Sequence, residues 1–231
     1  QTGSFRVHFD EQIFDGPFAG EVLVAFASPK QRREPRQAMH AWVGAPPLLR
    51  FEVSAGEGGM LLTPTNAAAC WPTDWSEVQA GDWKVQVIAR RSLTGRKAGL
   101  SSGDVFSDVV DIHFDPTSKA AVELRLDQVV EADAFRPSDR TRMFEFVSPA
   151  LSAFHGFEYT MQAGVCLPRN YNPGEHYPVV YDITGFGGTA RSIANRARRM
   201  REGSTLDECI YVIPDASNLY GHSVFCDSNS I

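Results

Sequence analysis

The sequence predicts an α+β chain of two domains: an antiparallel β-sandwich of the immunoglobulin-like kind over residues 1–120, and an α/β segment over residues 121–231. Short alternating strands separated by turn residues fill the first region, as is typical of a sandwich. Two nearly continuous apolar runs with a helical stretch between them occupy the second region, as is typical of a parallel sheet buried on both faces. At 231 residues the chain is long enough for two such domains.

Composition and charge exclude several classes of protein. Hydrophobic residues make up 43% of the chain and charged residues 22%, which is ordinary for a globular protein. A net charge of -6 gives no long-range attraction to phosphate backbones, so nucleic acid is not an expected partner. No apolar run is long enough to span a membrane, so a membrane is not an expected partner either. The chain begins at Gln1, which leaves its location open, with a secreted or periplasmic one favoured.

In the first region, apolar and polar residues alternate between clusters of turn residues such as Asp15-Gly16-Pro17. No stretch here predicts a long helix. Residues 124–137 are polar and include a proline, so they are expected to connect the two domains. The expected strands are residues 5–9, 21–27, 49–53, 83–89 and 105–114.

The second region changes its pattern along its length. Residues 142–147 and 158–167 are expected to form an antiparallel pair of strands. Residues 179–183 and 210–213 are apolar runs that flank a helical stretch and predict parallel strands. With no further strand beside residues 179–183, one edge of the sheet stays unpaired, so self-association through this edge is expected.

The helical stretch between the two apolar runs is rich in arginine. Ala190, Ile193, Ala197 and Met200 recur at helical spacing, which indicates an apolar face. The arginines are therefore interpreted as the solvated face of an amphipathic helix, not as a nucleic-acid site. They are Arg191, Arg196, Arg198, Arg199 and Arg201.

The four cysteines have no close paired spacing, so the sequence predicts neither a metal site nor a redox motif, and no cofactor is expected. Cys166 and Cys209 lie in apolar strand patterns and are expected to be buried thiols. Cys70 and Cys226 complete the set.

A glycine cluster, Gly185-Phe186-Gly187-Gly188, comes directly after the first apolar run. Glycines in this position let the backbone adopt positive φ and turn N–H groups toward a developing oxyanion, with the start of a helix adding a favourable dipole. A tight turn without a ligand is the alternative interpretation. The spacing fits neither G-x-G-x-x-G nor a P-loop, which argues against a nucleotide.

Five segments of the second region carry a family resemblance: residues 148–156, 163–168, 177–181, 185–188 and 213–216. They resemble the esterase family of α/β-hydrolases that includes enterochelin esterase and esterase D. The resemblance implies a serine esterase, with an accessory β-rich domain preceding an incomplete three-layer α/β-hydrolase domain, and a small-molecule or carbohydrate ester as substrate.

By this resemblance, Phe186 and Gly187 are the candidate oxyanion donors, and Thr184 stands where many relatives place a histidine. The nucleophile is less clear. Gly221-His222-Ser223-Val224-Phe225 has only the first half of the elbow G-x-S-x-G, with neither a strand before it nor a helix after it. Ser223 stays a candidate nucleophile, although these departures favour a loop residue. We therefore expect this chain to be an N-terminal portion of an esterase, inactive by itself.

The residues offer few acids or bases for a triad, and none of the histidines is assigned a catalytic role. Asp215 follows the second apolar run, but it precedes the position expected for the triad acid in this fold. The alternative function is a non-catalytic binding module whose tryptophans stack on sugar rings or contact a protein. Trp71 and Trp75 flank a loop, and Trp42 and Trp83 lie elsewhere in the first region, although tryptophans often fill a sandwich core.

Overall fold

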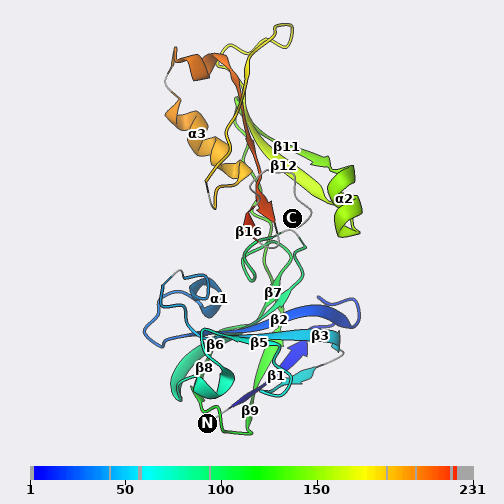
Figure 1. The fold of residues 1–231 in the computed structure, drawn as a ribbon, viewed down its shortest axis with the longest axis vertical. Helices are drawn as coiled ribbons and strands as arrows, with labels where there is room; N and C mark the ends of the chain where they lie inside the picture. Colours follow the sequence, from blue (N-terminus) through cyan, green and yellow to red (C-terminus); the bar gives the residue numbers. More distant parts are fainter. Residues whose placement is uncertain are drawn as a thin grey trace. The chain divides into compact units, whose positions relative to one another are not determined.

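The computed structural model describes residues 3–41, 43–56, 59–93, 95–185, 187–200, 202–218 and 221–222, without the side chains of residues 55 and 56. The chain divides into two compact units, Gln1–Ala132 and Asp133–Ile231 (Figure 1). No helix in the described ranges is long and apolar enough to cross a membrane.

The first unit is built from two sheets that enclose one core. Most of its strands pair antiparallel, but the first strand pairs in parallel with the ninth. A short helix, α1 (Pro35–Ala38), and a 3-10 turn, η1 (Trp75–Glu77), connect strands. The smaller sheet has the order β4 (Met60–Leu62), β1 (Ser4–Phe9), β9 (Ala121–Leu126); the larger has the order β10 (Gln128–Val129), β7 (Val105–Phe106), β6 (Gly81–Arg90), β2 (Phe18–Ala27), β3 (Leu48–Gly56), β5 (Ala69–Trp71), and β8 (Val110–Phe114) also pairs with β6.

Aromatic rings fill the core between these sheets. Phe5, Phe26 and Phe114 are fully buried, and the rings of Phe26 and Phe114 meet edge to face with centroids 5.2 Å apart. Alternation along β2 turns Val22 and Val24 inward together with Phe26. Burying each such side chain contributes about 1.5–3 kcal/mol, so this unit has a core of its own.

The strands expected in the first region are confirmed, with two differences. Residues 105–114 form two strands, β7 and β8, instead of one. Residues 124–137 are not simply a connection, because they contain the end of β9 and all of β10. The side chains of Leu124 and Leu126 enter the core, so the compact unit continues to Ala132 and does not end at the expected residue 120.

The second unit contains a four-stranded sheet. The expected antiparallel pair is confirmed as β11 and β12, and the two apolar runs form the parallel pair β13 and β14 with helix α3 between them in sequence. The sheet order is β11 (Thr141–Val147), β12 (Thr160–Cys166), β14 (Ile210–Pro214), β13 (Val179–Tyr181); the other elements are α2 (Pro149–His155), η2 (Ala190–Ser192), α3 (Ile193–Arg199), η3 (Thr205–Glu208) and the hairpin β15 (Ser217–Asn218) with β16 (Gly221–His222).

Helix α3 covers one face of this sheet. Ile193 and Met200 are buried against Cys166, Tyr211 and Ile213 of the strands. The helix approaches β12 very closely at Gly164. A Cβ atom there would lie 2.1 Å from the carbonyl oxygen of Ala190 and 2.7 Å from Cβ of Ile193, so the packing requires a glycine.

The opposite face of the sheet is exposed. Phe144 and Tyr181 are 55% and 67% exposed, and Phe146 and Val179 are also largely exposed. The register places all four on the face opposite Cys166 and Tyr211. The expectation of burial on both faces is therefore wrong for the described residues, because they supply a helical cover on one side only.

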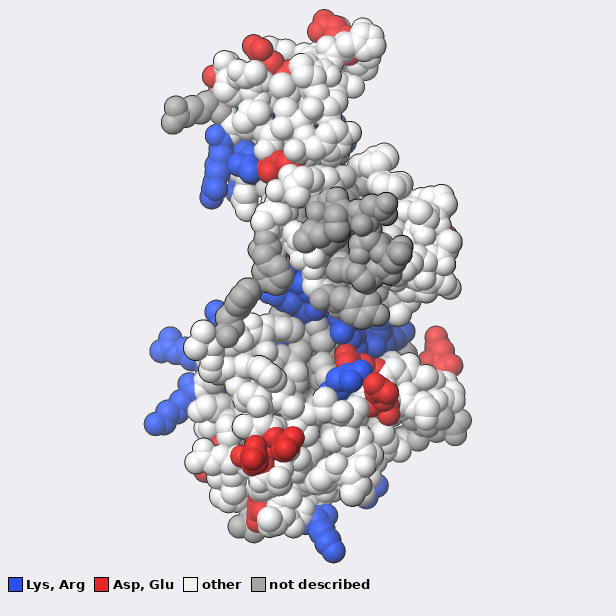
Figure 2. All heavy atoms as spheres, in the orientation of Figure 1, with Lys and Arg blue, Asp and Glu red and all other residues white. Residues whose placement is uncertain are grey.

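The arginine-rich helix is amphipathic, as predicted. Ala190, Ile193 and Met200 are buried, while Arg196 and the other described arginines are exposed. Figure 2 shows basic side chains gathered over the α3 segment. Arg196 is paired with Asp182 at the end of β13 and lies over the ring of Tyr211, so the helix is tied to the sheet by charge as well as by packing.

Candidate functional site

The glycine turn predicted to bind an oxyanion lies at the carboxyl end of β13, beside its parallel neighbour β14. The N–H of Gly188 donates to the carbonyl of Gly185 at 2.9 Å, which closes a β-turn. Gly187 has φ of 85°, in the left-handed region that glycine adopts readily. Its N–H has no hydrogen-bond partner among the described residues. The turn therefore offers one backbone donor at the edge where open α/β sheets bind ligands.

A carboxylate already occupies the start of the helical segment behind this turn. The Asp215 side chain follows β14 and accepts the N–H of Ala190 and the N–H of Ser217, both at 2.8 Å. The negative charge of Asp215 thus lies at the N-terminal, positive end of the η2 dipole. Asp215 acts here as a positioning residue for the turn, and its oxygen atoms bond to backbone groups, not to a histidine.

Close packing within the turn involves Thr184. A Cβ atom on Gly188 would lie 2.4 Å from Cβ of Thr184, so the fourth residue of the turn must also be glycine. The Thr184 hydroxyl is buried and has no partner within the described part of the chain. The position where the resemblance expects histidine thus contains an enclosed hydroxyl group.

Two of the candidate site residues, Phe186 and Ser223, lie outside the described residues. The interpretation of Ser223, a candidate nucleophile favoured as a loop residue, and the role of one of the two candidate oxyanion donors therefore stay predictions. His155 stacks on the ring of Tyr159 with centroids 4.9 Å apart, and burial raises the pKa of the Tyr159 hydroxyl, as does Asp215 nearby. No serine hydroxyl is hydrogen-bonded to His155 or His176 in the ranges the structure describes.

The tryptophans of the first unit separate into two environments. Trp75 is only 5% exposed and contacts Phe5 and Phe51 in the core. Trp83 packs against the same core and donates its indole N–H to the carbonyl of Gln79. Trp71, by contrast, is 61% exposed. Trp42 lies outside the described residues, so Trp71 is the tryptophan that the structure leaves available for a ligand among those described.

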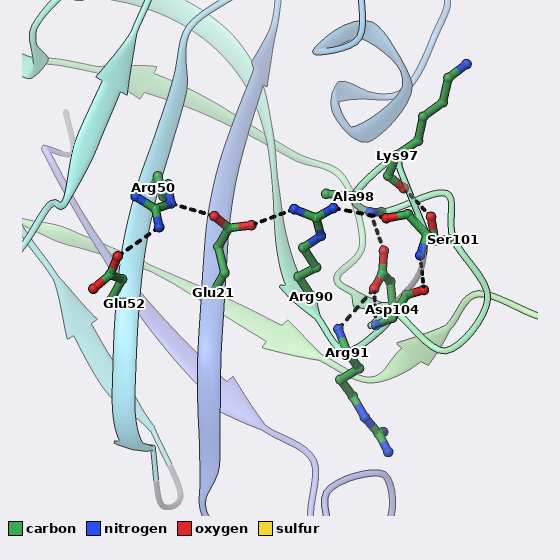
Figure 3. A network of polar contacts seen from close by, with 12 residues as sticks. Glu21, Arg50, Glu52, Arg90, Arg91, Lys97, Ala98, Ser101 and Asp104 are labelled. Carbon is green, nitrogen blue, oxygen red and sulfur yellow. Dashed lines mark hydrogen bonds and ion pairs between the residues drawn. The ribbon is translucent and has the colours of Figure 1, made fainter. Parts of the chain in front are cut away.

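Trp71 lines a cavity of about 270 Å³ on the outer face of the larger sheet. Arg50, Glu21 and Arg90 form a row across β3, β2 and β6 on this face (Figure 3). Arg50 Nε donates to Glu21 at 2.5 Å, and Arg90 Nη1 lies 3.3 Å from the other carboxylate oxygen of Glu21. His40 and Arg96 complete the polar part of the wall.

One wall of the cavity is a loop organised by the buried carboxylate of Asp104. Its oxygens accept the backbone N–H groups of Arg91, Ser92 and Gly99 at 2.8–3.0 Å. Burial raises the pKa of the Asp104 carboxyl, and these three hydrogen bonds act in the opposite direction. The loop carries Arg96 into the cavity wall.

Another part of the wall follows α1 in the chain. His40 Nε2 lies 3.0 Å from the carbonyl oxygen of Ala98, which joins this wall to the loop. Burial lowers the pKa of the His40 imidazole, and the positive charges of Lys97, Arg96 and Arg90 lower it further. Burial and the neighbouring positive charges thus favour the neutral form of this histidine.

The sequence offered Trp71 as a ligand contact only in the alternative interpretation, and it did not indicate the charged residues beside it. Glu21, Arg50 and Arg90 are far apart along the chain and meet only because the strand register places Glu21 opposite Arg90 and Leu23 opposite Arg50. A search for polar residues on the outward face of predicted strands would have found the candidates but not their partners.

Cys166 and Cys209 are buried thiols, as predicted, while Cys226 lies outside the described residues. Burial raises the pKa of the Cys166 thiol. Among the described residues, no group of three or more His, Cys, Asp or Glu side chains could hold a metal ion. No family model matches this chain, and no curated protein matches it.

Proposed function

We propose that the second unit is part of a carboxylic ester hydrolase that uses a serine nucleophile on a small-molecule or carbohydrate ester. The fold proposed with it is a three-layer α/β-hydrolase for this unit and an immunoglobulin-like accessory sandwich for the first. The observation that carries the proposal is the Gly187 turn, at the carboxyl end of a parallel strand. It combines a positive φ with an N–H that has no hydrogen-bond partner among the described residues.

The chemistry assigned to this turn is stabilisation of charge. When a serine attacks an ester carbonyl, the carbonyl oxygen becomes negatively charged, and a fixed N–H donor stabilises that charge more than it stabilises the neutral ester. Asp215 fixes the backbone just after the turn through Ala190. This fixed geometry spares the donor any reorganisation during the reaction.

The test is hydrolysis of p-nitrophenyl acetate by the natural protein that carries this chain. Gly187→Ala forces a Cβ onto a backbone with φ of 85° and should displace the N–H donor. We expect kcat to fall about tenfold to a hundredfold, with KM changed about twofold or less. Gly174→Ala is the matched control, because Gly174 is exposed in the same unit and an added Cβ there meets only ordinary contacts.

Ser223→Ala separates the two interpretations of the nucleophile. We expect this substitution to leave the turnover of the natural protein unchanged and the 231-residue chain alone to show none. Turnover that disappears in Ser223→Ala would make Ser223 the nucleophile. Absence of ester hydrolysis in the natural protein, or full activity in Gly187→Ala, would refute the proposed role of the turn.

A further inference from the structure

The cavity on the first unit has the chemistry of a binding site and does not depend on the proposed hydrolase. Its floor is apolar, with Leu23 buried in a small cluster on the outer side of the larger sheet. Three arginines, Arg50, Arg90 and Arg96, line it together with a single acidic residue, Glu21. Arginine side chains therefore outnumber carboxylates in the lining, in a chain whose net charge is -6.

Arg50 has hydrogen-bonding capacity left for a ligand. Its Nε donates to Glu21 and its Nη2 donates to Glu52 at 2.8 Å. Its Nη1 has no partner among the described residues, and the side chain is 42% exposed. The two glutamates hold the guanidinium in place, so its remaining N–H groups are oriented before a ligand arrives.

Trp71 lies within reach of Arg50 on the same face. Ala69 is directly opposite Arg50 in the β3–β5 pair, and Trp71 is two residues further along β5, opposite Leu48. Diagonal neighbours of this kind are about 7–8 Å apart, a distance that an aromatic ring and an arginine can bridge through one small ligand. A ring stacked on Trp71 would thus present a substituent to Arg50.

We propose that this cavity binds a single sugar residue that carries a carboxylate, a uronic acid, with the ring stacked on Trp71 and the carboxylate held by Arg50. A volume of about 270 Å³ suits one ring and is below the range of pockets for drug-sized ligands. Glu21 supplies acceptors for ring hydroxyl groups beside the arginine donors. An exposed indole with donors and acceptors in one row matches a ligand with an apolar ring face, hydroxyl groups and one negative charge.

The experiment is calorimetric titration of the chain with glucuronate and galacturonate. Glucose and galactose test the need for the carboxylate, acetate tests the need for the ring, and inorganic phosphate tests for a general anion site. We expect saturable uronate binding with Kd below about 10 mM, and binding of the other four probes at least about tenfold weaker.

Two variants and one control locate the site. Trp71→Ala should weaken uronate binding about tenfold or more, and Arg50→Gln should do the same while bringing uronate and neutral sugar to similar affinity. Arg6→Gln is the matched control, because Arg6 also pairs with a glutamate but lies on the smaller sheet outside the cavity. It should bind uronate like the unchanged protein. A thermal melt of each variant verifies that the first unit stays folded.

Several results would overturn the proposal. These are no saturable uronate binding, equal affinity for acetate, phosphate or a neutral sugar, or unchanged uronate binding in folded Trp71→Ala or Arg50→Gln. If a variant fails to fold, acrylamide quenching of indole fluorescence is measured in the unchanged protein instead. Uronate should protect the exposed Trp71 from quenching, and the absence of protection contradicts the proposal. None of these measurements involves ester hydrolysis, so they test uronate binding independently of the proposed hydrolase.

Discussion

The two units of this chain enclose their apolar side chains to different degrees. In the first, Phe5, Phe26 and Phe114 are fully buried between two sheets. In the second, the four-stranded sheet is covered by α3 on one face, while Phe144 and Tyr181 on the other face are more than half exposed. Both units use strongly apolar strands, so the strands do not determine closure. Closure depends on whether a second layer is present on each face.

This difference assigns different roles to the two units. The first has a closed core, and its outer face is free to carry the charged cavity beside Trp71. The second presents a glycine turn at the end of an edge strand that pairs only with β14 among the described residues. The self-association expected through this edge stays a prediction.

Unit-specific probes are built into the sequence. All four tryptophans lie within residues 1–132 and all six tyrosines within residues 133–231. Tryptophan fluorescence therefore follows unfolding of the first unit, and tyrosine absorption follows the second. Urea unfolding followed with both signals therefore reports the free energy of unfolding of each unit separately.

The largest contrast is expected from the same substitution made in both units. Phe26→Ala removes a fully buried ring and should lower the free energy of unfolding of the first unit by about 4 kcal/mol. Phe144→Ala removes an exposed ring and should change the free energy of unfolding of the second unit by less than about 1 kcal/mol. Equal losses would mean that the second face of the sheet is covered after all.

A buried carboxylate should matter next most, and only in the second unit. Asp207 is buried and pairs with Arg140 at 2.5 Å and Arg169 at 2.8 Å, so Asp207→Asn leaves both arginines without their charge partner. We expect the free energy of unfolding of the second unit, followed by tyrosine absorption, to fall by about 3 kcal/mol. The free energy of unfolding of the first unit, followed by tryptophan fluorescence, should not change. Asp133→Asn, which removes an exposed partner of Arg191, should cost less than about 1 kcal/mol. A loss in Asp133→Asn as large as that in Asp207→Asn would contradict the importance of burial.

The close approach of α3 to the sheet predicts a somewhat smaller effect. Gly164→Ala places a methyl group 2.1 Å from the carbonyl oxygen of Ala190, so α3 must move away. We expect the free energy of unfolding of the second unit to fall by about 2 kcal/mol, because overpacking displaces Ile193 from its site. Gly174→Ala should be neutral. Retention of full stability in Gly164→Ala would show that α3 does not pack as closely as described.

The smallest effect concerns pH and the first unit. Because the pKa of His40 is lowered in the folded state, the folded protein binds fewer protons than the unfolded chain just below the ordinary histidine pKa of 6.5. Stability of the first unit should therefore fall as pH drops through this value, and the fall should be shallower in His40→Gln. An identical pH dependence of the urea midpoint in both proteins would rule out His40 as the cause.

Much of the fold follows from periodicity in the sequence. Alternation predicted β1, β2, β3 and β6, and continuous apolar runs predicted the parallel pair β13 and β14. The end of β9 was interpreted as part of a connection because residues 124–137 carry polar residues and a proline, although Leu124 and Leu126 alternate with Arg125 and enter the core. The exposed face of the second sheet could not be predicted, since an apolar strand does not reveal what covers it.

The candidate sites were predicted less completely. The turn at Gly185 and Gly187 was recognisable because glycines directly after a buried strand have a local cause. The role of Asp215 was not, because its bond to Ala190 joins residues 25 positions apart. The cavity row of Glu21, Arg50 and Arg90 depends on strand register, which the sequence of any one strand does not specify.

Native-state hydrogen exchange of the 231-residue chain, resolved by mass spectrometry, tests the contrast between the units most directly. Amides of β2 and β6, buried between other strands of a closed unit, should exchange only through global opening of that unit. Amides of β13, at an edge with an exposed face, should exchange at least about a thousandfold faster through local opening. Protection of β13 equal to that of β2 would contradict a β13 that lies at an edge of its sheet with one face exposed.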